Sequence, residues 1–251
     1  MTHPLAIIIM AAGKGKRMKN PEMAKVMYEV GGKPMIGHVV DLALKLLPAR
    51  TIVVVGWQKE SVIEHLRTVA KPVEFVEQKE LLGTGHAVMQ TEAVLRDFVG
   101  DVMILSGDVP LLTESTTAAL LGYHRSTEAF ATILTAEILD PTGYGRIIRN
   151  KDGSVKRIVE EKDAKKKEKD VKEINSGIYV FQKQALFESL KHLEPTNAQN
   201  EYYLTDVLDT FWRNKWRVSA VKALDAFEVM GINDVDQLQK AQKVLALRIG
   251  G

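Results

Sequence analysis

Apolar residues form short unbroken runs through the first half of the chain. Runs that lack alternating polar residues are typical of strands buried on both faces of a sheet. These runs are rich in leucine or in β-branched residues, which favours the same interpretation. The predicted strands are Leu5–Met10, Thr51–Val55, Val73–Val76 and Val102–Leu105.

Between these runs the apolar residues recur every third or fourth position, for example from Val39 to Leu46. This spacing is that of a helix with one buried face. Helices are therefore predicted in the segments that follow Lys33-Pro34, Gln58 and Gly85. An alternation of strands and helices predicts right-handed βαβ units and a mostly parallel sheet.

After Tyr123 the pattern becomes richer in strands, and Lys151-Asp152-Gly153 fits a hairpin turn. We therefore expect an α/β protein with a mixed, mostly parallel sheet and a smaller β-rich sub-lobe, in one domain over residues 1–251. The strands predicted here are Ala129–Ala136, Gly145–Arg149, Val155–Glu160 and Ile174–Phe181. The helices predicted here are Gln184–Lys191, Glu201–Arg213 and Val235–Arg248.

One segment, Glu161 to Lys172, mixes both signs of charge and contains no aromatic residue. Such a run predicts a solvated loop rather than a nucleic-acid surface. A lid over a binding site is a second interpretation.

The composition is that of a folded protein, with 45% hydrophobic and 26% charged residues in a chain of 251. The net charge of +2 is too small to predict a nucleic acid or an anionic membrane as partner. The chain has no cysteine, which excludes disulfides and thiolate catalysis. The absence of cysteine is also consistent with a reducing compartment.

The start of the chain lacks the basic region of a signal peptide. No apolar run approaches the ~20 residues that cross a bilayer. We therefore expect a soluble cytoplasmic protein whose partners are small molecules, without nucleic acid or membrane. Nothing in the sequence predicts the oligomeric state.

The first strand leads into the loop Ala11-Ala12-Gly13-Lys14-Gly15-Lys16-Arg17-Met18-Lys19. Small residues with free backbone N–H groups, followed by cations, suit a bound phosphate. Met18 stands where a dinucleotide fingerprint has its third glycine, and the Gly-Lys-Ser/Thr of a P-loop is absent. Taken alone, the loop is explained equally well as a glycine turn with solvated lysines. Lys25 adds a further cation nearby.

Further motifs follow the loop in a fixed order along the chain. Together with the loop and Lys25 they resemble the sugar-phosphate nucleotidylyltransferases, and in particular the uridylyltransferase part of N-acetylglucosamine-1-phosphate uridylyltransferases. The motifs are Leu82-Gly83-Thr84-Gly85-His86-Ala87, Gly107-Asp108-Val109-Pro110-Leu111, Asp140-Pro141-Thr142-Gly143-Tyr144-Gly145-Arg146-Ile147, Val159-Glu160-Glu161-Lys162-Asp163-Ala164, Glu173-Ile174-Asn175-Ser176-Gly177 and Asn197-Ala198-Gln199-Asn200-Glu201-Tyr202-Tyr203-Leu204-Thr205-Asp206.

The resemblance covers nearly the whole chain and implies a Rossmann-like nucleotidyltransferase domain with a sugar-binding sub-lobe. Bacterial members commonly add a C-terminal acetyltransferase β-helix, which this chain as given does not contain. Two positions depart from the family pattern. Ala24 stands where a proline usually precedes the lysine, and Ser106 stands where a tyrosine often precedes Gly107-Asp108.

The implied reaction transfers UMP from UTP to N-acetylglucosamine 1-phosphate and releases pyrophosphate, with Mg²⁺ as cofactor. A sugar phosphate is ionised at neutral pH, so the enzyme needs alignment and charge neutralisation rather than a general base. None of the six histidines is therefore needed for the chemistry. Two alternatives remain: a uridylyltransferase for another hexose 1-phosphate such as glucose 1-phosphate, and a regulator that binds a nucleotide sugar without turnover.

The resemblance also implies roles for single residues. Arg17 would bind the leaving pyrophosphate, and Lys25 the α-phosphate. Asp108 follows a strand end, where a hard carboxylate suits Mg²⁺, and Asn233 would be the second metal ligand. Without the resemblance, Asp108 would be read as a turn residue and Asn233 or Asp234 as a helix N-cap. The implied nucleotide-binding residues are Ala11, Ala12, Gly13, Gln78, Gly83 and Thr84. The implied sugar-binding residues are Thr84, Gly145, Glu160 and Asn175.

Overall fold

The structure is a computed structural model that describes residues 3–15, 17–18, 20 and 22–250. Lys16 and Lys19 of the glycine-rich loop lie outside the described residues.

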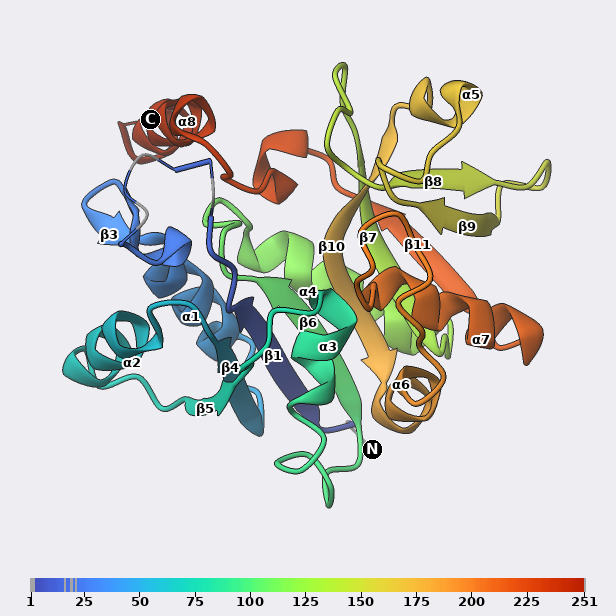
Figure 1. The fold of residues 1–251 in the computed structure, drawn as a ribbon, viewed down its shortest axis with the longest axis horizontal. Helices are drawn as coiled ribbons and strands as arrows, with labels where there is room; N and C mark the ends of the chain where they lie inside the picture. Colours follow the sequence, from blue (N-terminus) through green and yellow to red (C-terminus); the bar gives the residue numbers. More distant parts are fainter. Residues whose placement is uncertain (1–2, 16, 19, 21, 251) are drawn as a thin grey trace.

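A twisted central sheet runs through the molecule, with helices on both faces (Figure 1). Its strands lie in the order β11-β7-β10-β6-β1-β4-β5, and β8 joins β10 at one end and pairs with β9. Four of the six neighbouring pairs in this order are parallel, and β10 runs against both of its neighbours. This confirms the predicted α/β fold with a mixed, mostly parallel sheet. The strands are β1 Leu5–Ala11, β4 Arg50–Val55, β5 Glu74–Glu77, β6 Asp101–Ser106, β7 Ala131–Glu137, β8 Arg146–Arg149, β9 Val155–Val159, β10 Glu173–Gln182 and β11 Val218–Lys222.

Side chains that alternate along the strands build a core on each face of the sheet. Ile7 and Ile9 of β1 pack with α1, α2 and α4, whereas Ala6 and Ile8 pack with α3, α6 and α7. A smaller core joins α8 to Met35 and to a short hairpin of β2 and β3. The helices are α1 Met35–Lys45, α2 Lys59–Thr68, α3 Thr84–Met89, α4 Glu114–Ser126, α5 Lys166–Lys169, α6 Lys183–Leu190, α7 Val207–Arg213 and α8 Val235–Gly250, and the hairpin strands are Glu29–Val30 and Lys33–Pro34.

The longest elements that were not predicted are helix α4 and strand β11. Helix α4 buries only Thr117, Leu120 and His124, so its apolar periodicity is weak. Strand β11 is half-buried at the edge of the sheet, where it pairs in parallel with β7. Neither segment carries the strong local pattern from which the other elements were predicted.

One predicted helix was too long. Helix α7 begins only at Val207, after a single 3₁₀ turn over Leu204–Asp206. The residues before this turn are extended because Tyr202 pairs with the loop that precedes α3: its N–H donates to Leu82 O at 2.8 Å, and its carbonyl accepts from Gly85 N at 2.8 Å. A contact distant in sequence therefore overrides the local helical pattern.

The charged segment from 161 to 172 has no buried residue, as expected for a solvated stretch, but it is not a loop throughout. It contains the one-turn helix α5, and the Glu168 side chain pairs with Arg157 of β9. At its start, Glu161 Oε2 accepts from Arg146 of β8 at 2.6 Å. These ion pairs attach the segment to the β8–β9 hairpin, which lies to the upper right in Figure 1.

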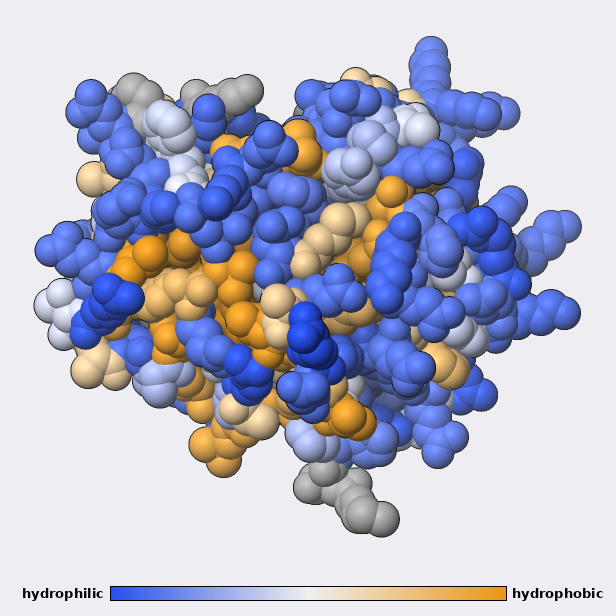
Figure 2. Space-filling view, turned by 60° about the horizontal axis from the view of Figure 1, so that its bottom comes forward, coloured by the Kyte–Doolittle hydropathy of each residue, from blue (hydrophilic) through white to orange (hydrophobic). Residues whose placement is uncertain are grey.

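The face drawn in Figure 2 is largely hydrophilic, with hydrophobic residues visible mainly in its left and central parts. Within the part of the chain that the structure describes, no helix is both long and apolar enough to cross a membrane.

Candidate active site

Parallel strands bring three predicted site segments to one edge of the sheet. Ala11 ends β1, Gln78 follows β5 and Asp108 follows β6, and the carboxyl ends of these strands point the same way. A cavity of about 500 Å³ opens at this edge. Open α/β sheets bind ligands in this position. The predicted site residues that line the cavity are Ala11, Ala12, Gly13, Lys25, Gln78, Gly83, Thr84 and Asp108.

The glycine-rich loop folds over the stem of Lys25. Gly15 has φ +60°, and a Cβ built on it would lie 2.6 Å from the Cβ of Lys25. This position therefore requires glycine both for its backbone conformation and for the close approach. Beside it, the Lys14 ammonium lies 4.6 Å from the ring centre of Trp57. The backbone N–H of Trp57 donates to Ala12 O at 3.1 Å.

Lys25 joins the two predicted metal ligands. Its Nζ donates to Asp108 Oδ2 and, at 3.0 Å, to Asn233 Oδ1. The three residues are far apart in the sequence, because Asp108 is 83 and Asn233 is 208 positions from Lys25. The side chains of Lys25 and Asp108 are only 15% and 17% exposed, so the pair is well shielded from water.

Local hydrogen bonds hold Asn233 beside Asp108. Ile232 N donates to Asp108 O at 2.9 Å. The N-cap of α8 is Asp234, whose Oδ1 accepts from Gln237 N at 2.8 Å, while Gln237 Oε1 accepts from Asn233 N at 2.7 Å. Because Asp234 caps the helix, the side-chain oxygen of Asn233 is left to face Lys25.

The donor set fits Mg²⁺. One carboxylate oxygen and one amide oxygen already meet at a single cation, the Lys25 ammonium. Hard oxygen ligands of this kind suit Mg²⁺, which takes one or two protein oxygens and completes its shell with phosphate and water. Among the described residues no group of three or more histidine or acidic side chains could hold a metal by itself. Substrate oxygens would therefore have to supply the other ligands.

The predicted base-binding residues lie on the other wall of the cavity. The Gln78 side chain is 4% exposed, and its amide N–H group donates to Gly83 O at 3.0 Å and meets His86 Nδ1 at 3.1 Å. The donors of Gln78 thus position the loop before α3, which leaves its carbonyl oxygen for a ligand. Thr84 Oγ1 accepts from Leu204 N at 3.0 Å and fixes the start of α3.

Three predicted sugar residues meet where β8, β9 and β10 come together. Asn175 N donates to Gly145 O at 2.8 Å, and a Cβ built on Gly145 would lie 3.2 Å from Glu160 Oε2. Glu160 Oε1 accepts from Thr205 Oγ1 at 3.1 Å. Burial raises the pKa of the Glu160 carboxyl, and the hydrogen bond from Thr205 opposes this increase.

A bulge in β10 sets the position of Asn175. Residues 176–178 stand out of register between Asn175, which pairs with Thr135, and Tyr179, which pairs with Ile133. Asn175 Oδ1 accepts from Gly177 N at 3.2 Å, and its Nδ2 donates to the Tyr179 hydroxyl at 2.6 Å. The side chain that is expected to bind the sugar also closes the bulge that presents it.

Tyr144 lies near Asp108, and Arg17 lies near Tyr144. Arg17 lies exposed in the glycine-rich loop, and among the described residues it forms no ion pair. The Tyr144 hydroxyl is buried beside the backbone of Gly231. Burial raises the pKa of Tyr144, and the charge of Asp108 raises it further. Tyr144 belongs to the motif from Asp140 to Ile147, but no local pattern marks its side chain as a site residue.

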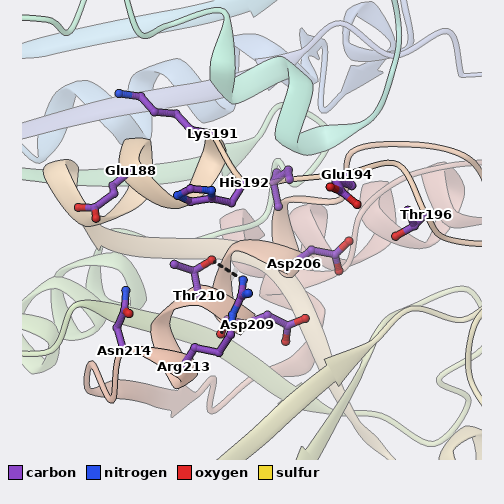
Figure 3. A pocket seen from close by; sticks show the side chains of 11 residues that line it. Glu188, Lys191, His192, Glu194, Thr196, Asp206, Asp209, Thr210, Arg213 and Asn214 are labelled. Carbon is purple, nitrogen blue, oxygen red and sulfur yellow. Dashed lines mark hydrogen bonds between the residues drawn. The ribbon is translucent and has the colours of Figure 1, made fainter.

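A second hollow, of about 810 Å³, lies between α6 and α7 (Figure 3). Both carboxylate and cationic side chains line this hollow. Within α7, Arg213 donates a hydrogen bond to Thr210 Oγ1 at 3.1 Å. Burial and the neighbouring carboxylates raise the pKa of Asp206 to about 6. None of the predicted site residues lines this hollow.

Comparisons with known proteins identify the family of the chain. A family model described as nucleotidyl transferase matches residues 6–231, which is most of the chain. The chain belongs to the nucleotidyl transferase family. This membership confirms the resemblance drawn from the motifs.

Curated relatives in this family carry the name "Bifunctional protein GlmU". The protein of Streptococcus mutans is 48% identical over 96% of this chain, and that of Pelotomaculum thermopropionicum is 44% identical over 98%. The chain spans about half the length of these relatives, 52% and 53% respectively. A solved UDP-glucose pyrophosphorylase in complex with UDP-glucose shares the fold, with a TM-score of 0.75 over 99% of this chain and all of the other, at 20% identity.

Proposed function

We propose that residues 1–251 act as one nucleotidyltransferase domain that transfers UMP from UTP to N-acetylglucosamine 1-phosphate, giving UDP-N-acetylglucosamine and pyrophosphate. The observation that carries this proposal is the meeting of Lys25, Asp108 and Asn233, of which Lys25 and Asp108 line the strand-edge cavity. A cation beside a pair of oxygens that could hold Mg²⁺ suits a triphosphate rather than a neutral ligand. Relatives named GlmU at up to 48% identity support the same activity.

In the proposed reaction an oxygen of the sugar phosphate forms a bond to the α-phosphorus of UTP, and the bond from that phosphorus to the β-phosphate oxygen breaks. Pyrophosphate leaves with the electron pair of the broken bond. Lys25 binds the α-phosphate and Arg17 the departing pyrophosphate, so both residues neutralise charge that concentrates in the transition state. Asp108 and Asn233 would hold Mg²⁺, which supplies charge neutralisation at the reacting phosphates.

The same proposal assigns the two substrates to two separate groups of residues. The Gln78 side-chain carbonyl, with backbone groups of Ala11–Gly13 and Gly83, would bind the uracil. Gly145, Glu160 and Asn175 would bind the sugar, with Thr84 at the boundary between the substrates. Burial of the Glu160 carboxylate is compensated when hydroxyl groups of a sugar donate hydrogen bonds to it. A cytoplasmic location, where nucleoside triphosphates are found, belongs to this proposal.

The decisive test measures pyrophosphate release across a matrix of nucleoside triphosphates and sugar 1-phosphates. We expect the highest kcat/KM for UTP with N-acetylglucosamine 1-phosphate. A higher value for glucose 1-phosphate would assign the domain to another hexose, which is the alternative that Ser106 keeps open. Tight binding of UDP-N-acetylglucosamine without any turnover would instead indicate a regulator. A preparation carrying Asp108→Asn controls for contaminating activity.

A further inference from the structure

The position of the Lys25 ammonium has a consequence for metal binding. It donates to Asp108 Oδ2 and to Asn233 Oδ1 at 3.0 Å. These are the two oxygens that a divalent cation would use. The ammonium therefore neutralises the carboxylate and occupies the direction from which the metal must approach.

Binding two cations to these oxygens at the same time costs electrostatic free energy. An ammonium within hydrogen-bond distance of Asp108 would repel a divalent cation bound to the same carboxylate, and the small exposure of both side chains limits screening by water. The stem of Lys25 is held under Gly15, so its flexible outer part is what must move. A phosphate oxygen is the natural new partner for the displaced ammonium.

We infer that Lys25 withholds the Asp108–Asn233 pair from divalent metal until a nucleotide phosphate draws the ammonium away. This inference rests on the proposed function, because it takes the ligand to be a nucleotide. Its consequence is positive coupling: nucleotide binding strengthens metal binding, and metal binding strengthens nucleotide binding by the same factor. The free protein then avoids holding a metal without substrate.

The test uses Mn²⁺ as the probe and the electron paramagnetic resonance signal of free Mn²⁺ as the readout. Binding to the protein is measured without any nucleotide, for wild type and for Lys25→Met. Methionine keeps an unbranched stem beneath Gly15 and removes the charge. We expect Lys25→Met to bind Mn²⁺ at least about tenfold more tightly than wild type, which corresponds to about 1.4 kcal/mol.

Two controls locate the effect. Lys33→Met removes another half-buried lysine that pairs with a carboxylate, Asp41, away from the site, and it should leave Mn²⁺ binding unchanged. The double variant Lys25→Met/Asp108→Asn should lose the gain, because the metal then lacks its charged ligand. Circular dichroism checks that each variant is folded.

If Lys25→Met binds Mn²⁺ no more tightly than wild type, the inference is overturned. A gain that survives Asp108→Asn in the double variant overturns it too. This comparison involves no substrate, so it can fail while uridylyl transfer stands, and it can succeed in a protein without turnover. In wild type, UDP-N-acetylglucosamine should strengthen Mn²⁺ binding several-fold, and an unchanged Mn²⁺ affinity in the presence of bound nucleotide sugar would contradict the coupling.

Discussion

The two ends of the candidate site are built on different principles. At the proposed nucleotide end, side chains extend from loops near the carboxyl ends of parallel strands. The charges of Lys25 and Asp108 neutralise each other, and the uncharged amide of Asn233 accepts a hydrogen bond from Lys25. At the sugar end, a buried carboxylate, Glu160, and an amide, Asn175, are held by hydrogen bonds among antiparallel strands. The first end is suited to stabilising charge and the second to reading hydroxyl groups. Substitutions at the two ends should therefore alter different kinetic constants.

The largest effect is expected at the metal pair. Asp108→Asn removes the charged ligand and should nearly abolish turnover, a loss of several kcal/mol of transition-state stabilisation. Asn233→Ala should mainly raise the Mg²⁺ concentration needed for half-maximal rate, because water can replace one neutral ligand. A magnesium titration of activity measures both effects, and the exposed substitution Asp97→Asn is the control. Wild-type metal dependence in both variants would place the ion elsewhere.

Arg17→Ala should have the next largest effect and should separate catalysis from product binding. Loss of a group that stabilises developing charge commonly costs ~2.7–4 kcal/mol in the transition state. We expect kcat to fall accordingly, while the affinity for UDP-N-acetylglucosamine, which lacks the departing phosphates, changes little. Stopped assays of pyrophosphate formation and calorimetry of the product measure the two quantities. An equal loss of product affinity would mean that Arg17 has another role.

Glu160→Gln tests the sugar end. Hydrogen bonds to a charged acceptor contribute about 1.5–3 kcal/mol, so we expect the KM for the sugar phosphate to rise by roughly tenfold or more while the KM for UTP stays near its original value. The exposed Glu188→Gln is the matched control. A rise in both KM values, or in neither, would remove the distinction between the two ends.

Sequence patterns predicted the strands of the proposed nucleotide end, because their apolar runs are strong local signals. The roles of its residues came from the resemblance, because the glycine-rich loop alone fits a glycine turn equally well. The position of Asn233 beside Asp108 came only from the resemblance, since 208 positions separate it from Lys25 and no local pattern links them. At the proposed sugar end, no local sequence pattern predicts the bulge in β10 or the contact of Thr205 with Glu160. Both depend on segments that are distant in the sequence and adjacent in the fold. Edge strand β11 was missed for its weak pattern.

The smallest expected effect concerns the second hollow, which none of the predicted site residues lines. The pKa of Asp206 is raised to about 6, so the folded protein disfavours the charged form and loses stability as the pH rises from about 4 through 6. Asp206→Asn should raise the free energy of unfolding at pH 7.5 by about 1 kcal/mol after allowance for solvent screening. The gain should vanish below pH ~4, where the carboxyl is protonated in both states.

Urea unfolding at several pH values measures this difference. Glu188→Gln, at an exposed residue that lines the same hollow, serves as the comparison. A stability gain that does not depend on pH would mean that the substitution acts through packing. Unchanged uridylyl transfer in Asp206→Asn would show that this hollow does not contribute to sugar binding.

The bulge in β10 separates the part of the strand that carries Asn175 from the part that pairs with β6. Tyr179 to Gln182 pair with β6 and fix the strand to the parallel half, whereas Glu173 to Asn175 pair with β7 beyond the out-of-register residues. Because three residues absorb the mismatch, the outer part of β10 can change its alignment without shifting the inner part. Grafts that replace this outer part together with the β8–β9 hairpin therefore offer a route to new sugar specificities on an unaltered nucleotide-binding frame.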